Sequence, residues 1–166
     1  MVNQDQSNTI TVNFAVNGVD RNIRIDPRYS LADVLRDQLR LTGLHLGCEQ
    51  GVCGACAVLI DGEPAVSCLT LAAQVDGANI ETVEHIAGSG PDLGKLQRSF
   101  IKHGAFQCGF CTPGFLIMGH YLVNAGMAGD RETVRRNLSG NICRCTGYES
   151  IIDAIVAVGA GADGDE

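Results

Sequence analysis

The sequence predicts an α+β protein of two domains, a small mixed β-sheet with one helix followed by a bundle of about four helices. Strand-like alternation and hairpin turns occur only in the first half of the 166 residues. Helical spacing of apolar residues dominates after about residue 85. Between the halves, "GSGP" at 88–91 is typical of a linker. We therefore expect domains at residues 1–86 and 87–166.

The first domain begins with a predicted β-hairpin. Apolar and polar residues alternate over 9–16 and again over 19–25, as in strands with one buried face. Asn17 and Gly18 between them form the pair best suited to the positive φ angles of a two-residue turn.

A helix is predicted next, because Ser30 can cap it and Asp33 can reach back to the cap. Its apolar positions fall at helical spacing and are Leu31, Val34, Leu35 and Leu39.

A second hairpin is predicted from "AVLI" at 57–60 and "PAVSCL" at 64–69, with Asp61 and Gly62 as its turn. The segment "ANIETV" at 78–83 predicts one more short strand.

The second domain is predicted to contain four helices. Thr112 and Pro113 suit the N-cap and first helical position of the second helix, and Asp130 suits the N-cap of the third. The predicted helices cover 93–103, 113–124, 131–138 and 150–158.

The composition restricts the class of protein. Hydrophobic residues make up 45% of the chain and charged residues 19%, as in a soluble globular protein. The net charge of −7 argues against nucleic acid as a partner. The first ten residues are polar, unlike a secretory signal, and no apolar run reaches the roughly 18 residues of a membrane span. We expect a cytoplasmic protein without a membrane span.

Eight cysteines require an explanation in such a protein. Thiols stay reduced in the cytoplasm, so metal or redox chemistry is favoured over a disulfide framework. The cysteines divide into two sets of four with none left over, and we therefore expect no free nucleophilic cysteine and no catalytic residue in this chain.

The first set has the plant-type spacing for a 2Fe–2S cluster, Cys-x4-Cys-x2-Cys followed by a fourth cysteine after eleven residues. Glycines in the loop allow the backbone to curl around the cluster with its amides pointing inward, where they stabilise negative charge. The set consists of Cys48, Cys53, Cys56 and Cys68.

The second set pairs Cys-x2-Cys with Cys-x-Cys thirty-one residues later. Taken alone, it fits either a tetrahedral structural zinc or a second iron–sulfur cluster. The Cys-x-Cys pair departs from the usual arms of zinc ribbons, and the plant-type set in the same chain favours a second cluster. The set consists of Cys108, Cys111, Cys143 and Cys145.

Other residues have simpler interpretations. The four histidines are scattered and are expected to be surface or packing residues. Phe106, Phe110 and Phe115 flank the second cysteine set and are expected to be core and shielding residues.

Three motifs in order, "CEQGVCGAC", "QCGFCTPG" and "NICRCTGY", resemble the small iron–sulfur subunit of the molybdenum hydroxylases, the xanthine oxidase family. The resemblance covers about residues 9–160. It implies an N-terminal β-grasp, plant-ferredoxin-like domain and a C-terminal four-helix-bundle domain. Each domain would hold one 2Fe–2S cluster.

The resemblance also implies individual roles. The first cysteine set would hold the cluster nearer the flavin subunit, and the second set the cluster beside molybdopterin. Gln107 matches the glutamine that hydrogen-bonds the pterin, and Cys145 matches the cluster ligand closest to the pterin.

The implied partners are a large subunit and a medium subunit, in a dimer of heterotrimers. The large subunit would carry molybdenum on molybdopterin, expected as its cytosine dinucleotide, and the medium subunit FAD. The chain would transfer electrons from molybdenum to FAD and be the non-catalytic subunit of an oxidoreductase. The family's substrates are CO, aldehydes, acyl-CoA thioesters and N-heterocycles.

Two alternatives from other classes remain at this stage. A free-standing ferredoxin would need only the first domain, whereas this chain adds a helical half with four more thiols. A zinc-stapled interaction protein would use the same cysteines without redox chemistry.

Overall fold

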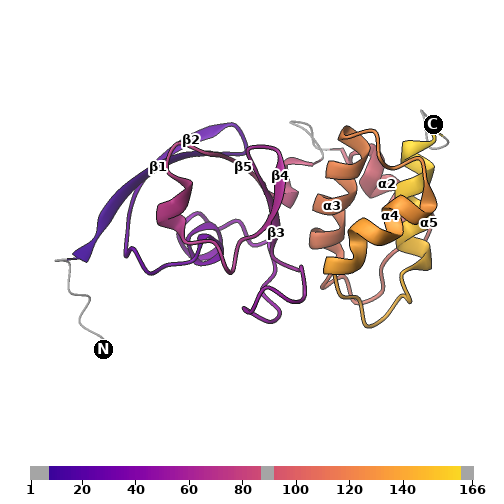
Figure 1. Ribbon diagram of the computed structural model, residues 1–166, viewed down its shortest axis with the longest axis horizontal. Coiled ribbons are helices and arrows are strands. Elements are labelled where there is room, and N and C mark those ends of the chain that lie inside the picture. The colour runs from indigo at the N-terminus through magenta and orange to yellow at the C-terminus, as the bar shows by residue number, and fades with distance from the viewer. Residues whose placement is uncertain (1–7, 87–91, 162–166) are drawn as a thin grey trace.

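The computed structural model describes residues 8–86 and 92–161, in which a sheet domain and a helical domain lie side by side (Figure 1). The predicted linker at 88–91 lies outside the described residues. The predicted α+β architecture is confirmed. No helix in the described part of the chain has the length and apolar character that a bilayer-spanning segment needs.

The sheet has five strands in the order β2-β1-β5-β3-β4. β1 pairs antiparallel with β2 and parallel with β5, while β3 pairs antiparallel with both β4 and β5. The sheet is therefore mixed, as predicted. The strands are β1 (Ile10–Val16), β2 (Val19–Ile25), β3 (Ala57–Ile60), β4 (Glu63–Val66) and β5 (Asn79–Glu81).

Both predicted hairpin turns form. Asn17 and Gly18 have φ angles of 52° and 76°, and Asp61 and Gly62 have φ angles of 50° and 85°. Positive φ at both central residues gives the turn a twist that matches the flanking strands.

A short helix packs on the concave face of the sheet. Ser30 caps α1 (Leu31–Asp33), and Asp33 accepts from the cap residue's backbone amide in return. The helix then widens into a π-helical turn at Val34–Gln38, where the amide of Leu39 donates to the carbonyl of Val34. The predicted helix is therefore present, with a π-helical second half that the sequence did not indicate. The side chains that it buries against the sheet are Leu31, Ala32, Val34 and Leu35.

Within residues 92–161 the helical domain contains four α-helices around an apolar core. The predicted cap of the second helix was wrong by one residue, because Cys111 occupies the N-cap and Thr112 begins the helix. Asp130 caps the third helix as predicted, accepting from the amide of Thr133 at 2.8 Å. The helices are α2 (Lys95–Lys102), α3 (Thr112–Asn124), α4 (Arg131–Asn137) and α5 (Glu149–Gly159).

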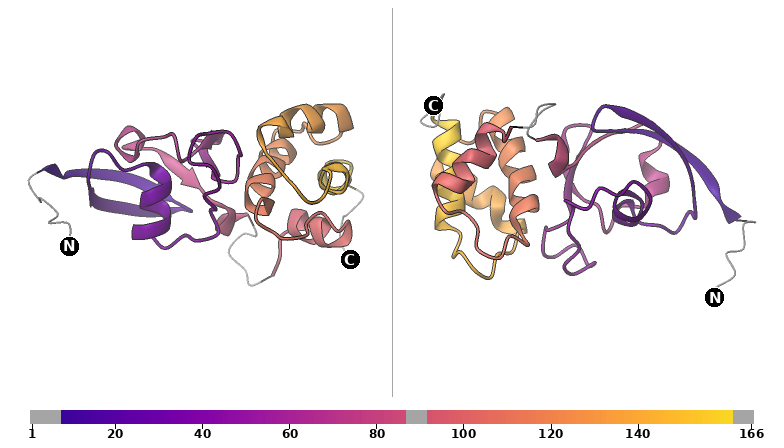
Figure 2. Two further views of the ribbon diagram at one scale, coloured as in Figure 1. Left: turned by 90° about the horizontal axis from the view of Figure 1, so that it is seen from below. Right: turned by 180° about the vertical axis from the view of Figure 1, so that it is seen from behind.

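Helix α3 joins the two domains. It lies against β3 in each view (Figures 1 and 2), and Ile117 is fully buried against Ala57 and Leu59 of that strand. The approach requires glycine at Gly114, because a Cβ there would lie 2.3 Å from the carbonyl oxygen of Gly54. The contact therefore holds the first cysteine loop against the start of α3.

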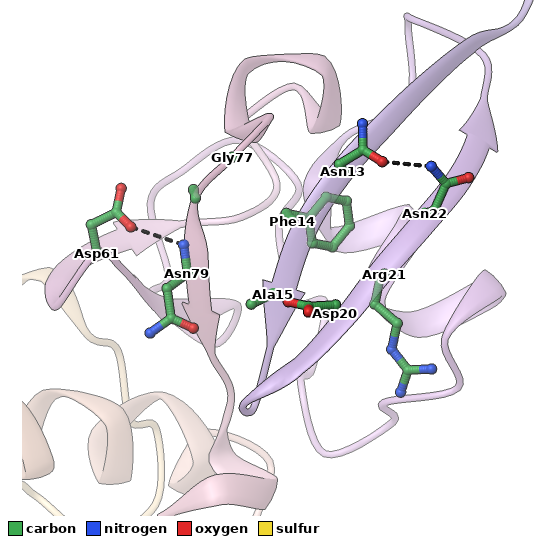
Figure 3. A pocket seen from close by; sticks show the side chains of 10 residues that line it. Asn13, Phe14, Ala15, Asp20, Arg21, Asn22, Asp61, Gly77 and Asn79 are labelled. Carbon is green, nitrogen blue, oxygen red and sulfur yellow. Dashed lines mark hydrogen bonds between the residues drawn. The ribbon is translucent and has the colours of Figure 1, made fainter.

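The part of the sheet beyond α3 carries an open pocket of about 500 Å³ (Figure 3). Asn22 donates to the side chain of Asn13 at 2.5 Å, and Asp61 accepts from the amide of Asn79 at 2.8 Å. None of the residues that line it is a cysteine, so the pocket is separate from both cysteine sets.

Candidate iron–sulfur centres

The first cysteine set gathers at one end of the sheet domain. Cys48, Cys53 and Cys56 lie on the loop that precedes β3. Cys68 was predicted to lie on a strand, but β4 ends at Val66 and Cys68 occupies the turn that follows.

Ser67 attaches this turn to the cysteine loop. Its amide and its hydroxyl both donate to the carbonyl of Cys56, at 3.2 and 2.8 Å, and Ser67 is fully buried. The contact brings Cys68 beside the thiol of Cys56. The turn after β4, held by buried Ser67, therefore positions Cys68, whereas the sequence predicted that a strand would do so.

Backbone amides point at the sulfur of Cys48. The amides of Gln50, Cys53 and Val52 lower the pKa of this thiol to about 7, and the amide of Gln50 lies 3.4 Å from the sulfur. Burial and the neighbouring Cys56 thiol instead raise the pKa of Cys68 to about 11.

Glycines create the room that the loop needs. Gly51 and Gly54 have φ angles of 73° and 69°, which side chains rarely tolerate. A Cβ at Gly47 would lie 3.2 Å from the sulfur of Cys53. The predicted curled loop with inward amides is present.

The second set joins two separate segments of the helical domain. Cys108 and Cys111 precede α3, and Cys143 and Cys145 lie between α4 and α5. The sulfurs of Cys145 and Cys108 are 3.6 Å apart, and the thiol of Cys111 lies beside that of Cys143.

The sulfurs of this set differ in their surroundings. Burial and the neighbouring Cys143 raise the pKa of Cys111 to about 12. Contact with the thiol of Cys108 raises the pKa of Cys145. For Cys143 burial acts against ionisation, but the hydroxyl and amide of Thr146, the amide of Cys145 and the thiol of Cys111 together lower the pKa.

Both sets suit a 2Fe–2S cluster. In each set, thiols from two separate segments interact with one another. Hydrogen-bond donors point at the sulfur of Cys48 in the first set and at the sulfur of Cys143 in the second. An anionic cluster needs such donors around its thiolates. In residues 8–86 and 92–161, no three His, Cys, Asp or Glu side chains converge on a point that would hold a single metal ion.

One edge of the second set reaches the surface. Cys108 and Cys145 are both exposed, and the side-chain amide of Gln107 donates to the carbonyl oxygen of Cys145 at 3.0 Å. The structure thus places the two predicted pterin-contacting residues, Gln107 and Cys145, together.

The aromatic residues near this edge differ from the prediction. Phe115 is fully buried, as expected of a core residue, whereas Phe106 and Phe110 are 41% and 48% exposed. Both exposed residues lie in the loop before α3, outside the packed helices, so the prediction that they are core residues was wrong.

Direct hydrogen bonds connect the two cysteine loops. The amide of Ile142 donates to the carbonyl of Cys53 at 2.9 Å, and the side chain of Asn141 donates to the carbonyl of Gly54 at 3.1 Å. Asn141 is 6% exposed, and Cys143 follows Ile142 in the chain.

His45 forms a second link between the loops. Its Nδ1 lies 2.8 Å from the carbonyl oxygen of Phe110, and the two rings stack 5.1 Å apart. The sequence predicted only a surface or packing role for this histidine, because nothing local indicates a partner 65 residues away.

Comparisons with known proteins agree with this arrangement. A family model described as a 2Fe-2S iron-sulfur cluster binding domain matches residues 14–84. A second, described as a [2Fe-2S] binding domain, matches residues 82–156.

Several relatives match almost the whole chain. The small subunit of nicotine 6-hydroxylase from Paenarthrobacter nicotinovorans is 47% identical, over 94% of this chain and 93% of the relative. Subunit gamma of caffeine dehydrogenase from Pseudomonas sp. (strain CBB1) is 51% identical, over 89% of each chain. The crystal structure of quinoline 2-oxidoreductase from Pseudomonas putida 86 superposes with a TM-score of 0.89, at 50% identity, over 94% of this chain and 97% of that chain.

The fold and its two cysteine sets define a protein with two 2Fe–2S-binding domains. The chain belongs to the small iron–sulfur subunits of the molybdenum hydroxylase, or xanthine oxidase, family. It is accordingly an electron-transfer subunit of an oxidoreductase.

Proposed function

We propose that this chain passes electrons one at a time from a molybdopterin centre on a large subunit, through two 2Fe–2S clusters, to FAD on a medium subunit. A 2Fe–2S cluster supplies one-electron chemistry when it is bound. The first cluster is held by Cys48, Cys53, Cys56 and Cys68. The second cluster is held by Cys108, Cys111, Cys143 and Cys145.

The observation that carries this proposal is the hydrogen bond from Ile142 to Cys53. Cys53 is a proposed ligand of the first cluster, and Ile142 immediately precedes Cys143, a proposed ligand of the second. Covalent bonds and one hydrogen bond therefore link the two sets. Such a short path suits two centres that exchange electrons in series.

The exposed edge of the second set supports the direction of transfer. Gln107 and Cys145 lie at the surface, where a pterin held by a large subunit can approach them. We assign them to contact the pterin, which we propose is present as molybdopterin cytosine dinucleotide. The first set then serves the medium, FAD-binding subunit, in a dimer of heterotrimers.

We propose a nitrogen heterocycle as the substrate of the complex. Nicotine, caffeine and quinoline, for which the relatives above are named, are all N-heterocycles. Substrate contacts belong to the large subunit. This part of the proposal therefore depends on the similarity between this small subunit and those of the relatives. The eight free thiols suit the reducing cytoplasm, where we place the complex.

Anaerobic purification of the chain together with its large and medium subunits tests the proposal. We expect iron and sulfide matching two 2Fe–2S clusters per chain, two distinct EPR signals after reduction, and molybdenum and flavin in the same complex. Zinc in place of iron would support the alternative of an interaction protein stabilised by structural zinc. A chain with both clusters that never associates with molybdenum or flavin subunits would be a free-standing ferredoxin.

The substrate class is tested on the same complex. We expect reduction by N-heterocyclic compounds under anaerobic conditions. Reduction causes bleaching of the visible spectrum. If aldehydes, acyl-CoA thioesters or CO bleach it and N-heterocyclic compounds do not, the assignment of an N-heterocycle is contradicted.

A further inference from the structure

Thr146 directs two hydrogen bonds at one sulfur of the second set. Its hydroxyl oxygen lies 3.0 Å from the sulfur of Cys143, and its amide nitrogen lies 3.4 Å from the same sulfur. Cys143 is 7% exposed, so water competes little for these bonds.

The direction of the hydroxyl bond follows from a third contact. The amide of Tyr148 donates to the hydroxyl oxygen of Thr146 at 3.2 Å. A threonine hydroxyl has one proton, and because its oxygen accepts from Tyr148, that proton is available for the sulfur of Cys143.

Tyr148 completes a closed network around this sulfur. Its phenol oxygen accepts from the amide of Cys143 at 3.1 Å, and its ring packs edge-on against the buried Phe115 at 6.2 Å. The network therefore fixes the backbone of Cys143 and the rotamer of Thr146 together. Polar networks in which each member has its partners are rigid.

The corresponding environment in the first set is different. The donors to the sulfur of Cys48 are backbone amides, among them that of Gln50 at 3.4 Å. A backbone amide is kept in every substitution except proline, whereas the hydroxyl of Thr146 depends on the side chain at that position. The second cluster thus has a donor that the amino acid at one position controls.

We propose that Thr146 is a positioning residue that raises the reduction potential of the second 2Fe–2S cluster through its hydroxyl bond to Cys143. Reduction adds one electron to the cluster, and a donor at a ligand sulfur stabilises the extra negative charge. The inference rests on the proposed ligand role of Cys143. Its consequence is that electrons favour the second cluster more than they would without Thr146.

Thr146→Val tests this inference, because valine keeps the shape and removes the hydroxyl. In the assembled complex, an EPR-monitored redox titration should show a lower midpoint for the second cluster, by about fivefold to tenfold in its reduction equilibrium. Tenfold corresponds to about 59 mV for one electron. The midpoint of the first cluster should not change.

Two further variants serve as controls. Thr146→Ser keeps the hydroxyl and should retain the wild-type midpoint. Thr133→Val removes a hydroxyl on α4 that donates to the N-cap residue Asp130, and it should leave both midpoints unchanged.

Several outcomes would overturn the inference. An unchanged midpoint in Thr146→Val with both clusters present is the most direct of them. If Thr146→Val does not retain the second cluster, Thr146→Ala provides the same comparison. Loss of the cluster in both variants would mean that Thr146 serves assembly rather than the potential. Absence of the second cluster from the wild-type complex would instead contradict the proposed function.

Discussion

The backbone amide of Ile142 donates a hydrogen bond of 2.9 Å to the carbonyl oxygen of Cys53. This bond joins the loop of the first cysteine set to the loop of the second. The neighbouring side chain of Asn141 reinforces it by donating to Gly54. The relative position of the two proposed clusters therefore depends on a few identifiable contacts.

Replacing Gly114 should weaken the packing of α3 against the first cysteine loop. Alanine in place of glycine normally stabilises a helix by about 1 kcal/mol. At Gly114 the new methyl group would lie 2.3 Å from the carbonyl oxygen of Gly54, so we expect a net loss of stability of about 1–3 kcal/mol. Urea unfolding of the iron-loaded protein measures the loss.

Gly129→Ala is the matched control, because no atom lies within 4 Å of the new methyl group. The variant should be at least as stable as the wild-type protein. Gly114→Ala should also weaken the magnetic interaction between the two reduced clusters in EPR spectra. Equal stability of the two variants would contradict the close packing of α3 on the first loop.

Substituting one cysteine from each set should produce different defects. Cys53→Ser should disturb the first cluster and the exit of electrons, while substrate still reduces molybdenum. Cys145→Ser should instead slow the transfer of electrons away from molybdenum. EPR spectroscopy and stopped-flow reduction by substrate distinguish the two defects, and loss of the same EPR signal in both variants would contradict the division into two sets.

Much of this arrangement could be predicted from the sequence because it depends on local chemistry. Asn17 and Gly18 form the first hairpin turn, since few other pairs adopt its φ angles. The spacing of the cysteines divides them into two sets, and contacts between thiols occur within each of these sets. These signals require only neighbours in the chain.

Several features that the sequence did not reveal concern long-range contacts. Cys68 reaches its set because buried Ser67 binds the carbonyl of Cys56, which no strand pattern reveals. The link from Asn141 to Gly54 spans 87 residues and depends on how α3 packs against β3. A polar residue beside a cysteine has no local feature that identifies such a partner.

Gln107→Ala should weaken docking of the pterin-bearing subunit. The side-chain amide of Gln107 is held beside Cys145 and has a second proton available for a pterin acceptor. We expect a loss of about 1 kcal/mol, the net worth of one hydrogen bond. The affinity of the large subunit for the iron-loaded chain measures this loss, and Gln97→Ala on α2 provides the control. If Gln107→Ala changes neither the affinity nor the electron-transfer rate, Gln107 does not have this role.

His120 should make stability depend on pH. Its side chain lies on α3, with Nε2 4.0 Å from a carboxylate oxygen of Glu81 on β5 and 2.9 Å from the side-chain nitrogen of Asn124. Burial lowers the pKa of His120 below its ordinary value of 6.5, with the charge of His85 acting in the same direction and that of Glu81 opposing it. The folded protein therefore disfavours the protonated ring.

The sign of the pH effect follows from this direction. Below about pH 6.5 the unfolded chain binds a proton at His120 that the folded chain resists, so stability falls as the pH decreases toward the lowered pKa. Thermal unfolding between about pH 7.5 and pH 5 should show this fall, and His120→Asn should make it shallower. Glu81→Gln should make the fall steeper, because it removes the charge that opposes the shift. A shallower decrease of stability with pH in Glu81→Gln would show that the carboxylate does not stabilise the protonated ring. An unchanged pH dependence of stability in His120→Asn would show that His120 does not control the pH response.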